Sequence, residues 1–223
     1  MPLTPPDFID SAARVRVAVD LLGADHSPAT LLDRLGELNP EHFQLTFVGP
    51  DRLADKPEFS VFSAQHLVTD EFIAQDDTLH TALRRKPKAS MRLALTLLQN
   101  GKADAVVSAG NTAALMSIAR SLVPRAPGLS RPAICKMLTG KQGPVWLLDL
   151  GANVGASAQQ LSQFGLLGAA LAAPAITRGR QVRVGLLNIG AEITKGPAVL
   201  ADAARLLEAP PYFDYIGFVE AHE

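Results

Sequence analysis

The chain of 223 residues contains one cysteine, and this scarcity together with two other absences excludes several classes of protein. Cys135 has no partner within the chain, so no internal disulfide can form, and such cysteine usage fits a reducing compartment. The longest apolar stretch, residues 164–176, falls well short of the roughly 20 residues that cross a bilayer. Residues 1–10 carry acidic groups and a Pro-Pro pair where a signal peptide has a basic start and an apolar segment, so we expect none.

Neither sign of charge is in excess. The 21 Lys and Arg nearly balance the 22 Asp and Glu, so there is no global basic field to hold nucleic acid, and we expect no nucleic-acid partner. A hydrophobic content of 48% with only 19% charged residues is enough for a sizeable core. The length fits one large or two small domains.

Short β-rich runs alternate with longer segments of helical periodicity. The expected strands are residues 14–20, 43–48, 104–107, 133–138, 145–149, 182–187 and 215–219, with a further strand within residues 61–68. The expected helices are residues 28–38, 90–100, 112–123, 158–173 and 197–208. The neighbourhoods of Pro57 and of Asp76 and Asp77 have the composition of loops. This alternation predicts an α/β fold, a three-layer sandwich with a mostly parallel sheet and right-handed crossovers.

Three turns share one placement, because each follows an expected strand and precedes an expected helix. They are residues 108–112, 149–153 and 188–196. Strand-to-helix turns at one edge of a parallel sheet converge and present unpaired backbone N–H groups to an anion. The sequence therefore predicts an enzyme that handles phosphate.

Each turn also has a plainer interpretation. Ser108, Gly110, Asn111 and Thr112 combine close backbone approach, an N-cap and hydroxyl donors, yet they are also ordinary helix-capping residues. The turn with Asp149 and Asn153 is, taken alone, more often a turn than a site. The third turn is the most specific, because the segment from Asn188 to Gly196 holds an amide, Glu192, a hydroxyl and Lys195. A lysine at a helix start opposes the macrodipole, which indicates an anion nearby.

Two further segments carry candidate residues. The first is a basic cluster ahead of a helix start, which is either a solvated loop or a contact for an anion or an acidic partner, and it comprises Arg84, Arg85, Lys86, Lys88 and Arg92. The second is the first strand-to-helix loop, with Asp20, Asp25 and His26. His26 is either a general base or an ordinary surface histidine.

Taken in order, these stretches resemble the PlsX-type phosphate acyltransferases of bacterial phospholipid synthesis. The resemblance runs over residues 14–223. It rests on Val19-Asp20 with Gly23 and Asp25, residues 82–85 with Ser90-Met91-Arg92, residues 108–112 with Ala114-Leu115-Met116, Arg131-Pro132-Ala133, residues 148–154, residues 185–190 with Glu192, Lys195 and Gly196, and residues 215–221.

The resemblance implies transfer of a fatty acyl group from acyl carrier protein to inorganic phosphate, giving acyl phosphate. It also implies a fold similar to the isocitrate dehydrogenase and phosphotransacetylase group, a homodimer, and no metal or organic cofactor. A flexible segment over residues 1–13 would precede one acyltransferase domain over residues 14–223. The product would feed a membrane-bound acyltransferase, so we expect a cytoplasmic protein that associates peripherally with the membrane.

Within that resemblance, the residues can be given roles. Ser108, Gly110, Asn111 and Thr112 are expected to bind phosphate. Lys195 is expected to stabilise the tetrahedral oxyanion, with Asn188 and Asn153 orienting it. The remaining candidates are Asp20, Asp25, His26, Asp149 and Glu192. The basic residues Arg84, Arg85, Lys86, Lys88 and Arg92 are expected to contact either the acidic carrier protein or phosphate.

The sequence also departs from the family pattern. Ala24 and Ala113 stand where the family has glycine, Gly155 stands where it has an acid, and an Asp-Gly-Phe-Thr-Gly-Asn-type motif does not occur before Glu223, so we expect a chain truncated at its C-terminus. The alternatives are a non-catalytic module that binds carrier protein or phosphate, and a short-chain phosphotransacetylase. A dehydrogenase is disfavoured, because the first turn lacks G-x-G-x-x-G.

Overall fold

The computed structural model describes residues 14–140, 143–175, 181–190, 192 and 195–221. Its contacts group into two compact units, Met1–Pro124 and Arg125–Glu223, which are described separately here as unit 1 and unit 2. The expected flexible segment over residues 1–13 lies outside the described residues. A single acyltransferase domain over residues 14–223 stays a prediction.

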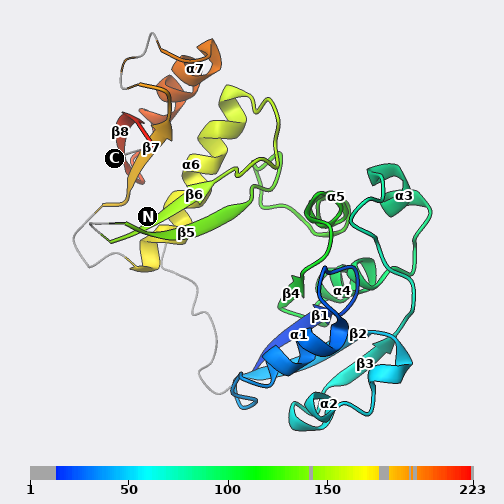
Figure 1. Ribbon diagram of the computed structural model, residues 1–223. Helices are drawn as coiled ribbons and strands as arrows, with labels where there is room; N and C mark the ends of the chain where they lie inside the picture. Colours follow the sequence, from blue (N-terminus) through cyan, green and yellow to red (C-terminus); the bar gives the residue numbers. More distant parts are fainter. Residues whose placement is uncertain (1–13, 141–142, 176–180, 191, 193–194, 222–223) are drawn as a thin grey trace. The chain divides into compact units, whose positions relative to one another are not determined.

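Unit 1 is built on a parallel sheet of four strands in the order β3-β2-β1-β4 (Figure 1). The strands are β1 (Val15–Asp20), β2 (Phe43–Gly49), β3 (Gln65–Val68) and β4 (Ala105–Ser108). The helices are α1 (Pro28–Leu35), α2 (Pro57–Val61), α3 (Leu79–Arg84), α4 (Ser90–Gln99) and α5 (Thr112–Leu122), with a 3-10 turn over Asp51–Leu53.

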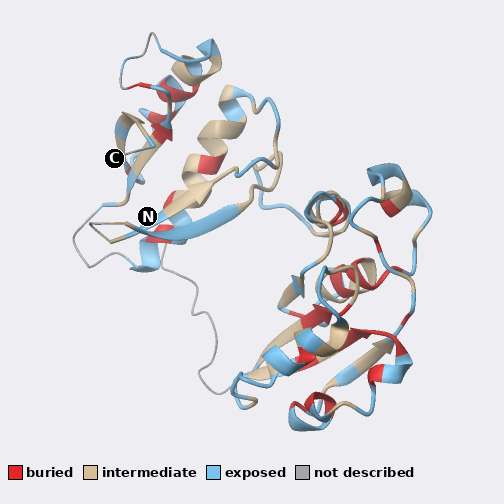
Figure 2. Ribbon diagram, viewed as in Figure 1, coloured by how far each residue is buried: buried red, intermediate tan, exposed pale blue. Residues whose placement is uncertain are grey.

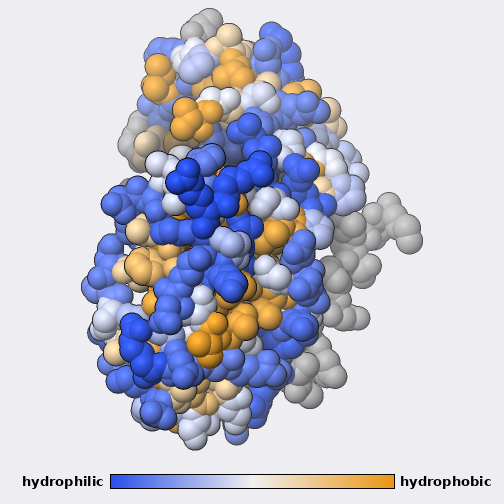
Figure 3. Space-filling view, turned by 90° about the vertical axis from the view of Figure 1, so that its right-hand side faces the viewer, coloured by the Kyte–Doolittle hydropathy of each residue, from blue (hydrophilic) through white to orange (hydrophobic). Residues whose placement is uncertain are grey.

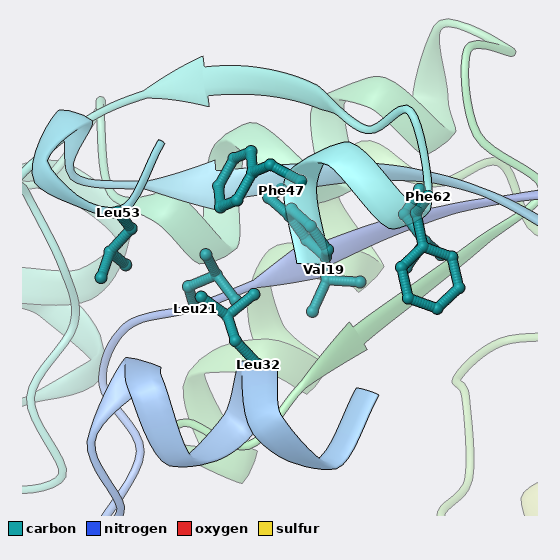
Figure 4. Packing of buried hydrophobic residues seen from close by; sticks show 8 residues of the cluster. Val19, Leu21, Leu32, Phe47, Leu53 and Phe62 are labelled. Carbon is teal, nitrogen blue, oxygen red and sulfur yellow. The ribbon is translucent and has the colours of Figure 1, made fainter. Parts of the chain in front are cut away.

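Helices cover both faces of this sheet. Successive side chains of a strand point to opposite faces, so Val19 and Leu21 pack on one side with Leu32 of α1 and Phe59 of α2. Figure 4 shows this packing, with Leu32 rising from α1 towards Leu21 and Val19. On the other side, Ala18 and Val48 pack with Ala94 of α4. Unit 1 therefore has the three layers that the sequence predicts.

The core of unit 1 is concentrated in its central strands, as the buried residues in Figure 2 show. Phe47 is fully buried in β2, and its ring meets that of Phe59 edge to face at 4.6 Å between centroids. Burying a side chain of this size stabilises the fold by about 1.5–3 kcal/mol. The sheet is thus anchored at β1 and β2, and the carboxyl end of β1 carries the first candidate loop.

The described residues of unit 2 form an antiparallel strand pair, a parallel strand pair and two α-helices. Its elements are β5 (Cys135–Gly140), β6 (Gly143–Leu148), α6 (Ala158–Ala172), a 3-10 turn over Ala173–Ala175, β7 (Arg183–Leu187), α7 (Ala198–Leu207) and β8 (Asp214–Val219). Strands β5 and β6 are antiparallel, whereas β7 and β8 are parallel. A capping box starts α6, because Ser157 accepts from the N–H of Gln160 while the Gln160 side chain accepts from the N–H of Ser157.

The α/β class and the mostly parallel pairing are confirmed, with three local differences. The strand expected within residues 61–68 is β3, which occupies only part of that range: Pro57 starts the short helix α2, Ser63 turns the chain at φ +46°, and β3 begins only at Gln65. Helix α3 lies in a stretch for which the sequence predicts no element. The β5–β6 pair is antiparallel, because only two residues separate the strands in the sequence and a parallel pair needs a much longer crossover.

Among the described residues, no helix is long and apolar enough to span a membrane.

An ion pair ties the start of β1 to the residue before β4. Arg16 donates to Asp104 from its backbone N–H at 2.9 Å and from Nε at 3.0 Å, and its Nη1 donates to the carbonyl of Gly101 at 2.7 Å. These hydrogen bonds lower the pKa of Asp104 from 3.8 to about 2. The Asp104 side chain remains 45% exposed, so water screens the pair and it contributes only modestly to stability.

We predict that Asp104→Asn lowers the free energy of unfolding at neutral pH, and that the deficit shrinks as the pH falls. A depressed carboxyl pKa contributes stability that is fully present above 3.8 and lost as the pH falls through about 2. Urea denaturation of parent and variant between neutral pH and pH 2 measures it. Asp33→Asn, at an exposed carboxylate of α1, is the control, and a deficit that stays constant with pH would contradict the assignment.

Candidate functional site

The strand order of unit 1 defines a place for a ligand. The chain runs from β1 to β2 and β3 on one side, then crosses back to place β4 on the other side of β1. The order therefore reverses between β1 and β4. In open α/β sheets, ligands bind at the carboxyl ends of the two strands that flank such a reversal. Those ends are Asp20 and Ser108, which are partners in the parallel register.

Asp20 is a buried carboxylate at this point. It is only 1% exposed; Oδ2 accepts the Ser108 hydroxyl at 2.7 Å and Oδ1 accepts the backbone N–H of Leu22 at 3.1 Å. Burial raises the pKa of Asp20, while the hydroxyls of Ser90 and Ser108 and the N–H of Leu22 oppose that rise. The Ser90 hydroxyl, at the start of α4, is itself buried without a hydrogen bond of normal geometry. Strands β1 and β4 and helix α4 thus meet around one carboxylate.

The loops that follow β1 and β4 lie against each other. A Cβ on Gly23, where φ is +76°, would lie 2.5 Å from the carbonyl oxygen of Ile73 and 3.9 Å from Cα of Gly110. A Cβ on Gly110 would lie 3.0 Å from Cε of Met91. Gly23 is therefore the residue type that both the dihedral angle and the space require. The two glycines bring the corners after β1 and β4 into contact.

Most donors of the expected phosphate turn already have partners. The N–H of Gly110 donates to Oγ of Ser108 at 3.2 Å, and Asn111 caps α5 by accepting the N–H of Ala114 at 3.0 Å. The Asn111 amide donates to the carbonyl of Gln75 at 2.9 Å. Since the first N–H groups of a helix lack intrahelical acceptors, the donors left for an anion include the N–H groups of Thr112 and Ala113 and the Thr112 hydroxyl, all on exposed residues.

A loop between β3 and α3 forms the wall of this corner. Gln75 donates from Nε2 to the carbonyl of Gly23 at 3.0 Å, while Asp77 pairs with Lys86 and accepts the N–H of Ala74 at 2.7 Å. The bond to Lys86 lowers the pKa of Asp77. Gln75 and Asp77 were not expected as site residues, because a polar loop far along the chain shows no sign in its sequence of where it packs.

The basic cluster divides into two groups. Lys86 is held by Asp77 and lies over the ring of Phe72 at 5.7 Å from the centroid, and Arg92 donates to the carbonyl of Leu83 at 2.9 Å. Arg84, Arg85 and Lys88 are exposed and form no ion pair among the described residues. Only these three side chains are therefore available to an acidic partner.

Asp25 and His26 are both exposed in the loop after β1. No hydrogen bond joins either side chain to Asp20 or Ser108 in the described part of unit 1. Both stay candidates by position alone.

In unit 2, the turn after β6 is braced by its own side chains. Asp149 adopts a left-handed backbone at φ +65°, and its Oδ1 accepts both the N–H of Asn153 at 3.1 Å and the Asn153 amide at 3.0 Å. The same amide lies 3.0 Å from the carbonyl of Pro132. Asn153 therefore holds the turn together, and its role towards Lys195 stays a prediction.

The turn after β7 gathers the other unit 2 candidates. Asn188 donates from Nδ2 to the carbonyls of Gly190 at 3.0 Å and Lys195 at 2.9 Å, and its Oδ1 is buried without a partner. Lys195 Nζ lies 3.0 Å from Oε2 of Glu192. The hydrogen bond and charge of Glu192, with a contribution from Glu220, raise the pKa of Lys195, which keeps it cationic at neutral pH. A lysine at this helix start indicated an anion nearby, and Glu192 is such an anion.

Residues of one expected site thus lie in two units. Within unit 1, Asp20, Ser108, Gly110 and Asn111 come together, as do Asn188, Glu192 and Lys195 within unit 2. Convergence of the three turns on one anion stays a prediction. Among the described residues, no three His, Cys, Asp or Glu side chains gather in a group that could hold a metal ion.

Comparison with known proteins decides the family. A family model described as a fatty acid synthesis protein matches residues 15–223. The chain belongs to this family. Among curated members, the phosphate acyltransferase of Hydrogenovibrio crunogenus is 38% identical over 222 residues, covering 94% of this chain and 64% of the relative. That of Herminiimonas arsenicoxydans is 42% identical over 209 residues, covering 87% of this chain and 57% of the relative.

The family assignment confirms the resemblance read from the sequence. The chain spans about three fifths of the length of these curated family members, since its match covers 64% of one and 57% of the other. Its fold is also similar to two solved structures. EutD phosphotransacetylase from Staphylococcus aureus has a TM-score of 0.60 at 16% identity, covering 93% of this chain and 69% of that one. A branched-chain phosphotransacylase from Enterococcus faecalis has a TM-score of 0.57 at 14% identity, covering 92% and 67%.

We predict that Gly23→Ala destabilises the protein more than Gly101→Ala. Both glycines have positive φ, +76° and +65°, so both alanines carry the left-handed strain of about 1–2 kcal/mol. A Cβ at residue 101 meets open space, whereas one at residue 23 meets the carbonyl oxygen of Ile73. That clash adds about 1–3 kcal/mol. Equal losses of unfolding free energy in urea denaturation would show that the loop moves aside freely.

Proposed function

We propose that this protein transfers a fatty acyl group from acyl carrier protein to inorganic phosphate. In this reaction a phosphate oxygen bonds to the thioester carbonyl carbon, the carbon–sulfur bond breaks, and acyl phosphate and the carrier thiol leave. Membership of the family, with identities near 40% to proteins named phosphate acyltransferase, carries the proposal. The corner at the reversal of strand order in unit 1 supports it, because such corners suit anions.

Phosphate would bind at the start of α5. Hydrated phosphate is a poor nucleophile, so a site must replace part of its water with fixed donors and hold it within attack distance. The N–H groups of Thr112 and Ala113 and the Thr112 hydroxyl serve this purpose, aided by the positive end of the helix. Ser108, Gly110 and Asn111 would shape the turn, since their polar groups are already paired.

Lys195 would stabilise the oxyanion that forms when phosphate attacks the carbonyl. Its ammonium is kept charged by Glu192, and the carbonyl of Lys195 is held by the Asn188 amide. Asn188 would therefore act by fixing the turn that carries Lys195. A thiolate leaves readily at its ordinary pKa, so no strong general acid is required.

The carrier protein would approach the basic end of α3. Arg84, Arg85 and Lys88 are exposed there, and the side chains of Phe72 and Leu79 are 44% and 45% exposed nearby in the chain. Figure 3 looks towards the side on which α3 and β3 lie and shows hydrophobic patches surrounded by hydrophilic residues. Positive charge steers an acidic partner, and the apolar side chains give it a surface to bury.

Three further features follow from the family resemblance. We propose a homodimer, delivery of acyl phosphate to a membrane-bound acyltransferase, and a cytoplasmic location with peripheral membrane association. The long acyl chain of the product supports the last two, since each buried CH₂ contributes about 0.8 kcal/mol to membrane partitioning.

Thiol release from palmitoyl carrier protein, measured with and without inorganic phosphate, tests the function. We expect release that depends on phosphate. Carrier binding without release would instead indicate a non-catalytic binding module. Turnover of acetyl-CoA in preference to the carrier thioester would indicate a short-chain phosphotransacetylase.

We predict that Lys195→Ala lowers phosphate-dependent thiol release by about 10²–10³-fold, the typical effect of removing one oxyanion donor. The loss should fall on kcat, because the oxyanion exists only in the transition state. Lys102→Ala, at an exposed lysine after α4, is the matched control. Turnover of Lys195→Ala within threefold of the parent would remove Lys195 from the mechanism.

A further inference from the structure

We infer that Asp20 is a positioning residue that sets the phosphate affinity of the corner at the start of α5 by holding Ser108. The inference rests on the proposed function, because it concerns the same phosphate site. Its basis is the continuous chain of hydrogen bonds that runs from the Gly110 N–H to Oγ of Ser108 and from the Ser108 hydroxyl to Oδ2 of Asp20.

Ser108 has one hydroxyl proton and donates it in a hydrogen bond to Asp20. A serine oxygen both donates and accepts, so with its proton on Oδ2 at 2.7 Å, its lone pairs face the Gly110 N–H at 3.2 Å. Asp20 thereby fixes the rotamer of Ser108. The Ser108 oxygen in turn fixes the peptide of Gly110, directly before the N-cap Asn111.

Asp20 is itself held in place. Its other oxygen accepts the Leu22 N–H, and the side chain is almost completely buried between the ends of β1 and β4 and the start of α4. The Ser90 hydroxyl beside Asp20 is also buried and has no hydrogen bond of normal geometry. Burial of the Asp20 carboxylate raises its pKa, so the carboxylate depends on these few donors rather than on water.

The hydrogen bonds of Asp20 and Ser108 also affect the donors that would bind phosphate. Thr112 and Ala113 follow Asn111 directly, so the direction of their N–H groups is set by the turn that Ser108 and Gly110 shape. Donors that stabilise an anion must be aimed before it arrives. Asp20 touches neither phosphate nor the thioester in this arrangement, and it acts only through Ser108.

The experiment measures the binding of inorganic phosphate to the whole chain by calorimetry, at a temperature where every variant is folded. Asp20→Asn replaces the acceptor Oδ2 with an amide that donates, and Ser108→Ala removes the relay. We expect each to weaken phosphate binding about tenfold, which corresponds to about 1.4 kcal/mol. Asp20→Asn/Ser108→Ala should bind no more than about twofold weaker than either single variant, since residues that act through each other are not additive.

Two comparisons separate positioning from a general structural role. Ser108→Thr keeps the hydroxyl and should bind phosphate within about twofold of the parent, and the exposed Asp33→Asn should do the same. Ser108→Ala and Ser108→Thr decide the question if Asp20→Asn does not fold. The inference is overturned if the single variants keep the parent's affinity, if their effects multiply in the double variant, or if the parent binds no phosphate.

Thiol release measured on the same samples distinguishes this inference from the proposed function. Phosphate binding that responds to the Asp20 and Ser108 variants in a parent that releases no thiol supports the inference and overturns the function. Phosphate-dependent release with affinity indifferent to these variants does the reverse.

Discussion

A buried carboxylate at the end of the central strand organises unit 1. Asp20 pairs in register with Ser108, so the two side chains stand on the same face at adjacent strand ends, and the hydrogen bond between them joins the last strand of the sheet to the first. Removing a carboxylate from water is costly unless its oxygens are bonded. The backbone after β1 and the hydroxyl of Ser108 supply those bonds, and the loops of the candidate site grow outward from them.

The corner around Asp20 combines rigidity with a few free donors. Glycines at positions 23 and 110 let the loops after β1 and β4 contact each other. Hydrogen bonds of Gln75 and Asn111 connect the β3–α3 loop to these two loops, and the ion pair of Asp77 with Lys86 stabilises that loop. Each polar group used in this bracing is withdrawn from ligand binding. What is left for an anion is a small set of N–H groups at the start of α5 whose directions the bracing determines.

In unit 2, side-chain hydrogen bonds also fix the backbone of the turns after strands. Asp149 and Asn153 close the turn after β6 on themselves, and Asn188 closes the turn after β7 through two carbonyls. The salt bridge between Lys195 and Glu192 leaves the lysine exposed and charged. Side-chain amides therefore shape the backbone in all three turns, while cationic and N–H groups stay accessible for chemistry.

The sequence by itself determined the α/β class, most strands and helices, and the family, because hydrophobic periodicity and ordered glycine, asparagine and lysine motifs are local properties that survive without coordinates. It also identified Asp20 and Ser108 as candidates by their positions at strand ends, and Lys195 by its place at the start of an expected helix. Only the tertiary structure decided which polar groups already have partners. Lys86 pairs with Asp77, and Asp20 accepts a hydrogen bond from Ser108. Asn111 caps α5 and donates to the carbonyl of Gln75. These pairings join residues as many as 88 positions apart, and no local pattern encodes a distance of that kind.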